Sequence, residues 1–438
     1  MKFGATTTHT ASRKQLTTDL IDFLRTPRTV TLLGSTGSIG TQGLQVIEHL
    51  NSLAGTNPAD QYAPLRVHAL AAGTSSLSLL AQQAVTFHPE LVATSGTEEN
   101  ARELKETISA LAAERGVASY SPEIIWGEEA ATFAAQVGAD VVLNGITGSI
   151  GLRPTLAALE AGSQVALANK ESLIAGGALV RAAVDSSPLE QPMIPVDSEH
   201  SALAQALSAG TDREVDRLIL TASGGPFRGM NYEELRNVTP QQALAHPTWD
   251  MGLVVTTNSA SMVNKALEVL EAHHLFGIDL DRIDVTVHRQ SVVHSMVQFV
   301  DGSTIGQASP PTMLLPIALG LTWPHRISGV AQPCDWTQAS EWSFEPLDNT
   351  AFPAVKMIKN AGRRGGTFPA VFNAANEEAV AAFHAGAIRF TDMIETVDRV
   401  LHEHASSEAM CEEKKLSLDS VLDAERWARI RTNKILAE

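Results

Sequence analysis

The order of apolar runs and glycines near the start of the chain constrains the fold most strongly. Residues 29–33 form a short apolar run of strand-favouring residues, a glycine-rich turn covers residues 34–40, and apolar residues then recur at helical spacing from Leu44 to Leu50. This order predicts a strand, a tight turn and a helix. Such a unit is typical of folds in which helices cover a parallel sheet.

Further strand-like runs follow, and helix-like segments such as residues 97–113 separate them. The runs cover residues 65–72, 91–94, 123–126, 140–143 and 165–168. This alternation predicts the α/β class, with a doubly wound, Rossmann-like and mostly parallel sheet. We expect this domain to span residues 29–196, after an N-terminal extension formed by residues 1–28.

The pattern changes after residue 196. Strand-like runs at residues 217–222 and 292–299 lie on either side of an amphipathic segment, residues 261–276, which predicts a helix. Gly277 is a typical helix stop. Together these features predict a central α+β domain over residues 197–323.

The rest of the chain divides into two parts. Residues 324–349 are rich in proline, tryptophan and polar residues, which predicts a linker. Helical periodicity then returns in three segments, and we expect a helical C-terminal domain over residues 350–438. The three segments are residues 351–360, 368–385 and 391–404.

Charge and cysteine content exclude several classes of protein. The formal net charge is -17, which argues against general binding to nucleic acid or to an anionic membrane. The most apolar stretch, residues 313–323, is too short to span a bilayer and contains Pro316. Cys334 and Cys411 lack the spacing of a disulfide framework or a zinc site, which favours the cytoplasm.

The glycine turn is a candidate cofactor site. Gly34, Gly37 and Gly40 allow the backbone to approach a ligand closely, and the helix that follows can bind a pyrophosphate at its N-terminus. We therefore predict a bound dinucleotide, with a purely structural turn as the alternative. The second strand-like run ends at Gly73-Thr74 without the acidic residue that would bind the ribose of NAD, which favours NADP.

The letters Thr-Gly-Ser-Ile-Gly occur twice, at residues 36–40 and at residues 147–151. The surroundings of the two copies do not match, and their separation is too long for a repeat of the solenoid type. We interpret both as glycine turns.

Asp197 and Glu199 form a candidate metal site. Two carboxylates suit Mg2+ or Mn2+, which prefer oxygen ligands. On an extended segment these side chains face the same way, whereas Ser198 faces the other way unless the backbone turns there. Glu268 could complete the site. Taken alone, the first two residues would form an acidic surface turn, and Glu268 with Lys265 would form an exposed helix ion pair.

Groups that suit a phosphate occur in the same part of the chain. Ser223 follows a predicted strand, Ser259 precedes the predicted helix, and Asn264 and Lys265 lie in its first turn. Lys170 follows the strand at 165–168, at the end of the sheet where ligands bind, although a surface loop would contain such a residue as well.

Residues 246–252 resemble a mobile flap that covers a bound ligand. The segment begins with His246 and contains Trp249 and Met251. An ordered loop with a buried tryptophan is the alternative, and His246 would then pack in the core.

Several motifs together resemble the 1-deoxy-D-xylulose 5-phosphate reductoisomerase family, in the order in which that family has them. The resemblance covers the chain from about residue 29 to its end. Its motifs are residues 34–40, 167–173, 195–202, 223–227, 246–252, 258–268 and 373–377.

The resemblance implies an enzyme that depends on NADPH and on Mg2+ or Mn2+, and that binds a small sugar phosphate. It also implies a homodimer, with residues 197–323 as the catalytic, metal-binding and dimerisation domain. The implied cofactor contacts are Thr36, Gly37, Ser38, Ile39, Gly73, Asn169, Glu171 and Gly252. The implied metal ligands are Asp197, Glu199 and Glu268, which with Lys170 form the catalytic set. The implied substrate contacts are Lys170, Ser198, Glu199, Ser223, His246, Ser259, Asn264, Lys265 and Glu268.

Two other functions fit parts of the pattern. A plain NAD(P)-dependent dehydrogenase would share the two-domain plan and need no metal, but no cysteine lies where an acyl-thioester mechanism needs a nucleophile. A non-catalytic nucleotide-binding regulator would have lost its chemical groups, whereas every proposed ligand is present. Metal dependence and turnover with NADPH distinguish these alternatives.

Overall fold

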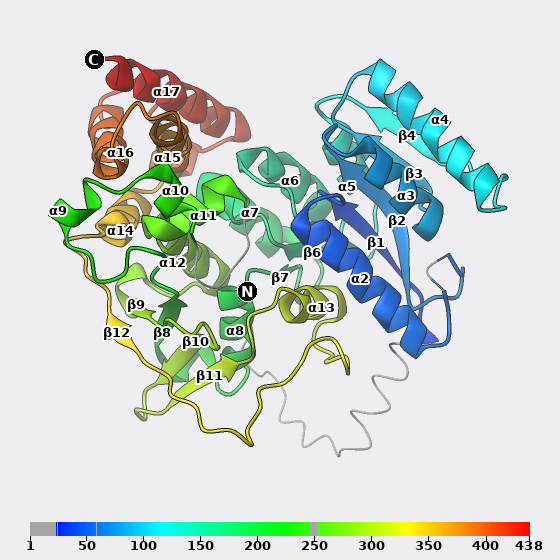
Figure 1. Cartoon of the computed structure of the whole chain (residues 1–438), viewed down its shortest axis with the longest axis horizontal. Helices are drawn as coiled ribbons and strands as arrows, with labels where there is room; N and C mark the ends of the chain where they lie inside the picture. Colours follow the sequence, from blue (N-terminus) through cyan, green and yellow to red (C-terminus); the bar gives the residue numbers. More distant parts are fainter. Residues whose placement is uncertain (1–22, 24, 58, 246–251) are drawn as a thin grey trace.

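The computed structural model describes residues 23, 25–57, 59–245 and 252–438. Two sheets form the centres of two lobes, and a helical C-terminal region packs beside the second lobe (Figure 1). The predicted α/β class, with its parallel N-terminal sheet and helical C-terminal region, is confirmed.

The first sheet has seven parallel strands in the order β4-β3-β2-β1-β5-β6-β7. Its strands are β1 Arg28–Leu33, β2 Leu65–Ala72, β3 Leu91–Thr94, β4 Glu123–Trp126, β5 Val141–Asn144, β6 Gln164–Leu167 and β7 Met193–Pro195. The sequence pattern predicted the first six within one residue at each end and missed β7. That strand has only three residues, too few for a periodic signal.

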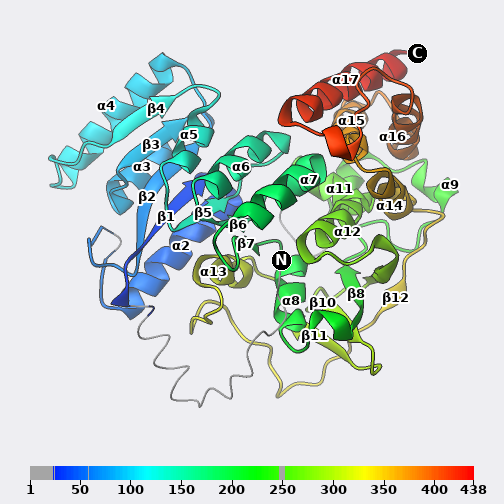
Figure 2. The same ribbon diagram turned by 180° about the vertical axis from the view of Figure 1, so that it is seen from behind.

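Helices cover both faces of this sheet. They are α2 Ser38–Leu53, α3 Leu77–Phe87, α4 Glu98–Glu114, α5 Ala130–Gln136, α6 Leu152–Glu160 and α7 Lys170–Ser186. Buried residues of α2, α3 and α4 share one core cluster with the sheet, and those of α5, α6 and α7 share another. Figure 2 shows the second group in front, on the side of the sheet away from α2.

A helix from much later in the chain completes the first face. In α13, Leu314–Thr322, Ile317 and Leu321 pack in the same core cluster as Val30 of β1. A Cβ atom on Gly320 would come within 2.8 Å of a Val196 side-chain carbon, so only glycine allows this close approach. The first lobe therefore includes residues from beyond the second sheet.

The second sheet has five strands in the order β11-β10-β8-β9-β12. They are β8 Val215–Ala222, β9 Ile283–Val287, β10 Val293–Phe299, β11 Thr304–Ala308 and β12 Glu345–Pro346. Only β8 and β9 pair in parallel. Helix α8, Ser198–Leu207, and helix α12, Val263–Phe276, cover one face. The segment predicted as a linker thus contains an edge strand of this sheet.

The helix predicted over residues 261–276 is shorter than expected. It is preceded by a separate helix, α11 Leu253–Ala260, and Met262 has a φ of 62°, in the left-handed region. A residue in this conformation cannot continue a right-handed helix, which explains the break. Gly277 ends α12 with a φ of 67°, so the predicted stop is confirmed.

The C-terminal region is helical as predicted. Its helices are α14 Ala354–Arg364, α15 Phe368–His384, α16 Phe390–His404 and α17 Leu418–Ala437. The sequence pattern found the first three and missed α17. Two short helices, α9 Tyr232–Leu235 and α10 Pro240–Ala243, connect β8 with the segment before α11.

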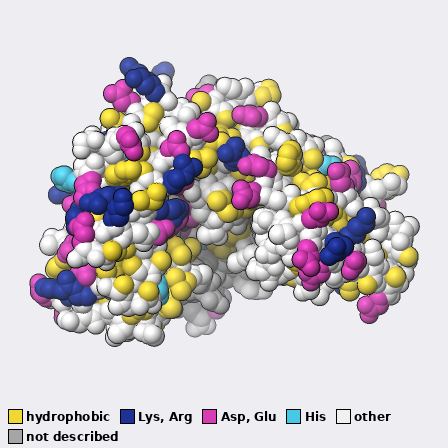
Figure 3. All heavy atoms as spheres, turned by 90° about the horizontal axis from the view of Figure 1, so that it is seen from above, with side chains coloured by type: hydrophobic (Ala, Val, Ile, Leu, Met, Phe, Trp, Pro, Cys, Tyr) yellow, Lys and Arg dark blue, Asp and Glu magenta, His cyan; other side chains and the backbone are white. Residues whose placement is uncertain are grey.

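Among the described residues, no helix is both long enough and apolar enough to cross a membrane. Figure 3 shows a hollow between the two lobes and charged side chains of both signs spread over the face that it draws.

Candidate active site

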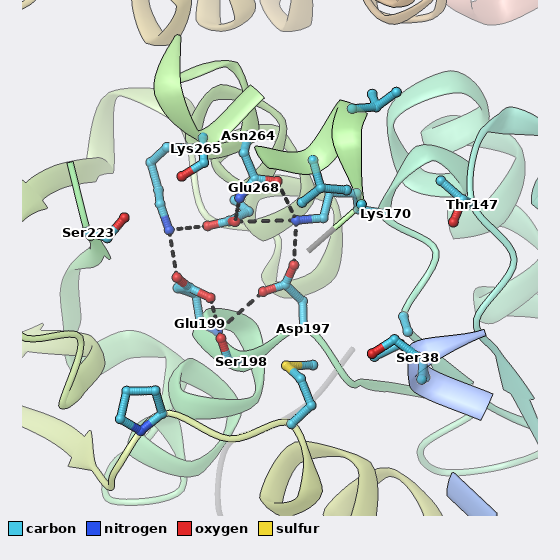
Figure 4. A pocket seen from close by; sticks show the side chains of 18 of the residues that line it. Ser38, Thr147, Lys170, Asp197, Ser198, Glu199, Ser223, Asn264, Lys265 and Glu268 are labelled. Carbon is cyan, nitrogen blue, oxygen red and sulfur yellow. Dashed lines mark hydrogen bonds and ion pairs between the residues drawn. The ribbon is translucent and has the colours of Figure 1, made fainter. Parts of the chain in front are cut away.

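A pocket of about 870 Å³ lies between the two lobes. Its walls include the turn after β1, the start of α7, the start of α8, and residues of α11 and α12. In Figure 4, Ser38 and Thr147 lie on one side of the pocket, whereas the charged side chains gather on the other. Residues that follow the carboxyl ends of the parallel strands thus form one wall of the pocket, as expected for an open α/β sheet.

Asp197 and Glu199 lie at the start of a helix, not on an extended segment. Strand β7 ends at Pro195, and α8 begins at Ser198 with Asp197 as its N-cap. The Asp197 side chain accepts a hydrogen bond from the Glu199 backbone N–H at 3.4 Å. The backbone thus turns at this segment, which is the alternative under which the period-two orientation does not apply, and helical geometry brings both carboxylates to the pocket.

Helix α12 supplies the third carboxylate. Asp197, Glu199 and Glu268 each offer an oxygen, and the three oxygens lie within 4.8 Å of one another. Glu268 is only 1% exposed, so the alternative in which it forms an exposed helix ion pair is wrong. Three convergent carboxylate oxygens suit a hard divalent cation.

Two lysines balance most of this negative charge. The Lys170 Nζ lies 2.6 Å from an Asp197 oxygen and 3.3 Å from a Glu268 oxygen. The Lys265 Nζ lies 2.9 Å from a Glu199 oxygen and also contacts Glu268. Two ammonium groups against three carboxylates leave a net negative charge, and this charge favours a divalent cation.

Burial and charge set the pKa values of these groups. Burial and the nearby Glu199 charge raise the pKa of Glu268 to about 7. Burial would also raise the pKa of Asp197, but the Lys170 ammonium holds it below its usual range. Burial would lower the pKa of Lys170, yet Asp197 and Glu268 hold it well above its ordinary value. Lys170 is therefore a cation at neutral pH.

A buried pair, His200 and Glu271, lies under the carboxylates. The His200 Nε2 lies 2.9 Å from the Glu268 carbonyl oxygen, and the His200 Nδ1 lies 3.3 Å from a Glu271 carboxylate oxygen. Burial lowers the pKa of His200, whereas burial and the Asp197 charge raise the pKa of Glu271 well above its usual value. Asp197, His200 and Glu271 form a second group with ligand-like spacing. Neither His200 nor Glu271 reaches the pocket wall.

The predicted glycine turn has the geometry of a cofactor cradle. Gly34 has a φ of 81°, and a Cβ atom on Gly40 would come within 2.3 Å of the Gly34 carbonyl oxygen. Helix α2 begins after Gly37 without a side-chain cap, so its first amides face a potential ligand. Gly37, Ser38 and Ile39 line the pocket.

The predicted polar contacts lie around the carboxylates. The Ser198 hydroxyl donates a hydrogen bond to Glu199 at 2.6 Å, and the Asn264 Oδ1 accepts one from the Lys170 Nζ at 2.9 Å. Ser223 and Ser259 line the same pocket as Lys265, and Figure 4 shows Ser223 on the Lys265 side of it. Hydroxyls, an amide and an ammonium together suit a phosphate group.

Most of the predicted site residues meet in this pocket. Those on its wall are Gly37, Ser38, Ile39, Lys170, Glu171, Asp197, Ser198, Glu199, Ser223, Gly252, Ser259, Asn264, Lys265 and Glu268. Thr36, Gly73 and Asn169 lie off the wall. His246 and the flap residues Trp249 and Met251 lie outside the described residues.

Asn169 supports the site from behind. It is buried, and its Nδ2 donates hydrogen bonds to the carbonyl oxygens of Ile146 at 2.7 Å and Gly148 at 2.9 Å. It also caps α7 by accepting a hydrogen bond from the Ser172 backbone N–H at 3.1 Å. Its side chain thus fixes a turn beside the pocket.

Sequence reasoning missed several residues of the wall. Thr147 lies in the second Thr-Gly-Ser-Ile-Gly copy, which carried a signal that we interpreted only as a turn. Ser291, with a φ of 51°, and the buried His294 come from the loop and strand after β9. Nothing local in the sequence marks these two, because sheet pairing brings them to the pocket.

Family models match most of the chain. A model described as 1-deoxy-D-xylulose 5-phosphate reductoisomerase matches residues 30–177. Two models of C-terminal domains of the same reductoisomerase match residues 193–276 and residues 308–431.

Full-length relatives are similar as well. The 1-deoxy-D-xylulose 5-phosphate reductoisomerase of Arthrobacter sp. (strain FB24) is 61% identical over 411 residues, which cover 94% of this chain and 98% of the relative. The enzyme of the same name from Mycobacterium avium (strain 104) is 52% identical and covers 93% of each chain.

Solved structures agree with these relatives. The reductoisomerase of Zymomonas mobilis in complex with NADPH has a TM-score of 0.82 at 37% identity, over 94% of this chain and 99% of that chain. A structure described as DOX-P reductoisomerase in complex with NADPH, fosmidomycin and magnesium has a TM-score of 0.80 at 33% identity. The match covers 94% of this chain and 98% of that chain.

Proposed function

The chain belongs to the 1-deoxy-D-xylulose 5-phosphate reductoisomerase family, and we propose that the pocket between its lobes carries out that family's reaction. The protein is an NADPH- and divalent-metal-dependent oxidoreductase of isoprenoid precursor synthesis. It converts 1-deoxy-D-xylulose 5-phosphate to 2-C-methyl-D-erythritol 4-phosphate. The observation that carries the residue assignment is the convergence of three carboxylates and a glycine turn on one pocket.

Asp197, Glu199 and Glu268 are the proposed ligands of Mg2+ or Mn2+, because their oxygens are the donors that these ions prefer. A bound divalent ion polarises the carbonyl and neighbouring hydroxyl oxygens of the substrate. The Ser198 hydroxyl already bonds one of the ligands, and it is a proposed substrate contact on the same helix turn.

Lys170 is the proposed residue for proton movement. Its ammonium group lies against Asp197 and Glu268, so it reaches the oxygens of a substrate held beside these carboxylates. A positioned ammonium can donate a proton to, or stabilise charge on, an oxygen of the substrate while the carbon skeleton rearranges. The Asn264 side chain fixes the Lys170 Nζ in place.

The phosphate of the substrate is proposed to bind at the Ser223, Ser259 and Lys265 end of the pocket. Binding energy from this unreactive end holds the reacting carbons in position. His246 is a further proposed contact, and the segment around Trp249 is the proposed flap.

The amides at the start of α2 are proposed to hold the pyrophosphate of NADPH, with Ser38, Ile39 and Glu171 as further contacts. Bound NADPH supplies the hydride that reduces the rearranged aldehyde. Thr36, Gly73, Asn169 and Gly252 complete the proposed cofactor set. Thr74 and Ser75, next to Gly73, offer hydroxyls rather than a cation to the 2'-phosphate, so NADPH selectivity is a specific point to measure.

One experiment tests the whole assignment. We expect NADPH oxidation, followed by absorbance, only when both 1-deoxy-D-xylulose 5-phosphate and Mg2+ or Mn2+ are present, and chelation should abolish it. Full activity after chelation would instead support a metal-independent dehydrogenase. Absence of turnover in folded protein that still binds NADPH would support a nucleotide-binding regulator.

We propose a homodimer formed through the second sheet. Leu218 and Leu220 of β8 face the helices, whereas Ile219 and Met296 face away and line a shallow groove with Phe344. A second copy would bury these apolar side chains. We expect Ile219→Asp to convert a dimer to a monomer in light scattering with size exclusion; a wild-type monomer would contradict the proposal.

The remaining assignments are proposals of the same kind. We propose that residues 29–196 form the NADPH-binding domain, that residues 197–323 form the catalytic domain, and that residues 350–438 support both. The two cysteines, which lack the spacing of a disulfide framework, support a cytoplasmic location.

A further inference from the structure

The motif Asn-Ala-Ala-Asn-Glu, residues 373–377, differs from the other motifs that the chain shares with its family. Among the described residues, it is the only one of these motifs that places no residue on the pocket wall. It lies in α15, in the helical C-terminal region, and no step of the proposed reaction uses it. Figures 1 and 2 show α15 beside α11, a helix that does line the pocket.

Asn376 of this motif joins α15 to α11. Its Nδ2 donates a hydrogen bond to the Asn258 Oδ1 at 2.9 Å. Asn376 is 2% exposed and Asn258 is 6% exposed, so water does not compete for this bond. Asn258 directly precedes Ser259, which lies on the pocket wall. The bond therefore ends one residue away from a proposed contact of the substrate phosphate.

His384 forms a second tie between the same two helices. The buried Thr257 Oγ1 lies 2.7 Å from the His384 Nε2, and it donates its own proton to the Leu253 carbonyl oxygen at 2.9 Å. Because the hydroxyl proton is used inside α11, the His384 Nε2–H is the donor to Thr257. Ala260 of α11 and Phe383 of α15 pack in one core cluster beside these bonds. Consecutive residues in the last turn of α11 are thus held by α15.

The position of α11 also sets the distance between two proposed phosphate contacts. Gly225 has a φ of 60°, and a Cβ atom there would come within 2.9 Å of the Ser259 carbonyl oxygen. Only glycine allows the loop after β8 to pack so closely on the end of α11. Ser223 lies in this loop and on the pocket wall. A shift of α11 would therefore move Ser259 relative to Ser223.

We propose that Asn376 and His384 are positioning residues, which hold α11 so that Ser259 and Ser223 together receive the phosphate of the substrate. The inference rests on the proposed function. Serines that are already in place lose less conformational entropy when the phosphate binds, so the two ties improve substrate affinity without touching the substrate. Both ties lie in the last turn of α11, away from the proposed cofactor contact Gly252 at its start.

Steady-state kinetics and NADPH titrations followed by fluorescence test the proposal. We expect Asn376→Ala and His384→Leu each to raise the KM for 1-deoxy-D-xylulose 5-phosphate about tenfold, because a hydrogen bond to a charged group is weakened. The value of kcat should stay within about threefold, and the Kd for NADPH within about twofold. His384→Gln keeps an N–H donor for Thr257 and should restore most of the substrate affinity.

A double-mutant cycle tests whether Asn376 acts through Asn258. Asn258 lies off the pocket wall, so Asn258→Ala should raise KM by about the same factor as Asn376→Ala. The double variant should then have a KM within about twofold of either single variant, since both changes remove one bond. Losses that multiply in the double variant would overturn the proposed route through Asn258.

Asn373→Ala is the matched control. Asn373 belongs to the same motif and is also 2% exposed, but its Nδ2 donates to the Glu377 Oε1 at 3.0 Å, within α15 itself. We expect its KM to be unchanged. An equal rise in this variant would assign the effect to general loosening of α15 and overturn the proposal.

An unchanged KM in either tie variant would likewise overturn the proposal, and each variant covers the case in which the other fails to fold. Wild-type protein without turnover would refute the proposed function, and this inference with it.

Discussion

The Lys170 Nζ lies 2.6 Å from an Asp197 carboxylate oxygen, and this contact joins the first turns of two helices that follow neighbouring strands of the first sheet. The parallel pairing of β6 and β7 brings both helix starts to the same edge. Lys170, the proposed catalytic residue, and Asp197, a proposed metal ligand, are therefore positioned by the same sheet, whereas Glu268 comes from the second lobe.

Lys170→Met should separate catalysis from metal binding. We expect turnover to fall about 100-fold or more, because a positioned acid–base group typically contributes that much. The Kd for Mn2+, measured by electron paramagnetic resonance, should be unchanged or lower, since the carboxylates lose a competing positive charge. Clearly weaker Mn2+ binding would show that Lys170 organises the ligands rather than the reaction.

Glu268→Gln and Glu271→Gln distinguish the two carboxylate groups with ligand-like spacing. Glu268 lies on the pocket wall, whereas Glu271 lies beneath it beside His200. We expect Glu268→Gln to abolish turnover and weaken Mn2+ binding, with little change in Tm, and Glu271→Gln to keep Mn2+ binding. If the second variant lost the metal instead, the ion would occupy the deeper group.

Ser223→Ala should mainly weaken substrate binding. We expect a KM for the sugar phosphate about tenfold higher and a kcat within about threefold, because one hydrogen bond to a charged group is lost at the unreactive end. Ser261→Ala, close in sequence to Ser259 but away from the pocket wall, is the control and should leave both constants unchanged. A large fall in kcat for Ser223→Ala would place this residue near the reacting carbons.

Glu425 should make stability depend on pH. Burial raises its pKa to about 7, while Ser149 and Arg429 oppose and Glu377 supports this shift. The folded state thus binds the proton more tightly than the unfolded state, so stability is greatest below about pH 4.5 and falls as the pH rises through 7. Glu425→Gln should be more stable than the wild type at pH 8, by on the order of 2–3 kcal/mol, and similar at pH 5.

Denaturant titrations at both pH values measure this difference. Asp423→Asn, on the same helix but with a side chain 64% exposed, should show no such dependence. A constant difference between Glu425→Gln and the wild type from pH 5 to pH 8 would contradict the raised pKa.

Local patterns predicted the first lobe well, because each of its strands before β7 combines an apolar run with a following helix. Around Asp197 the same reasoning left open an extended segment or a turn, and the structure has the turn, with Asp197 as a typical helix N-cap. It also missed the break at Met262, since nothing in that side chain favours a left-handed conformation.

The pocket residues that come from the second sheet could not be predicted from local sequence patterns. His294 of β10 and Ser291 of the loop before it reach the site through the pairing of β10 with β8, whose paired residues are 75 to 84 positions apart. Asn169 was predicted as a cofactor contact from its motif and stays a prediction; the structure adds that its side chain binds the carbonyl oxygens of Ile146 and Gly148 in the turn after β5. Motif matches located the site. Only the fold distinguishes the residues that line the pocket from the residues that hold the lining in place.

The packing of α13 on the first sheet has a consequence for synthesis on the ribosome. Ile317 and Leu321 close a face that strands β1 to β7 leave open, and they are made long after those strands. At about 5–20 residues per second, this face stays uncovered for roughly 6–25 s. The nascent first lobe therefore keeps this apolar face uncovered until α13 has been translated.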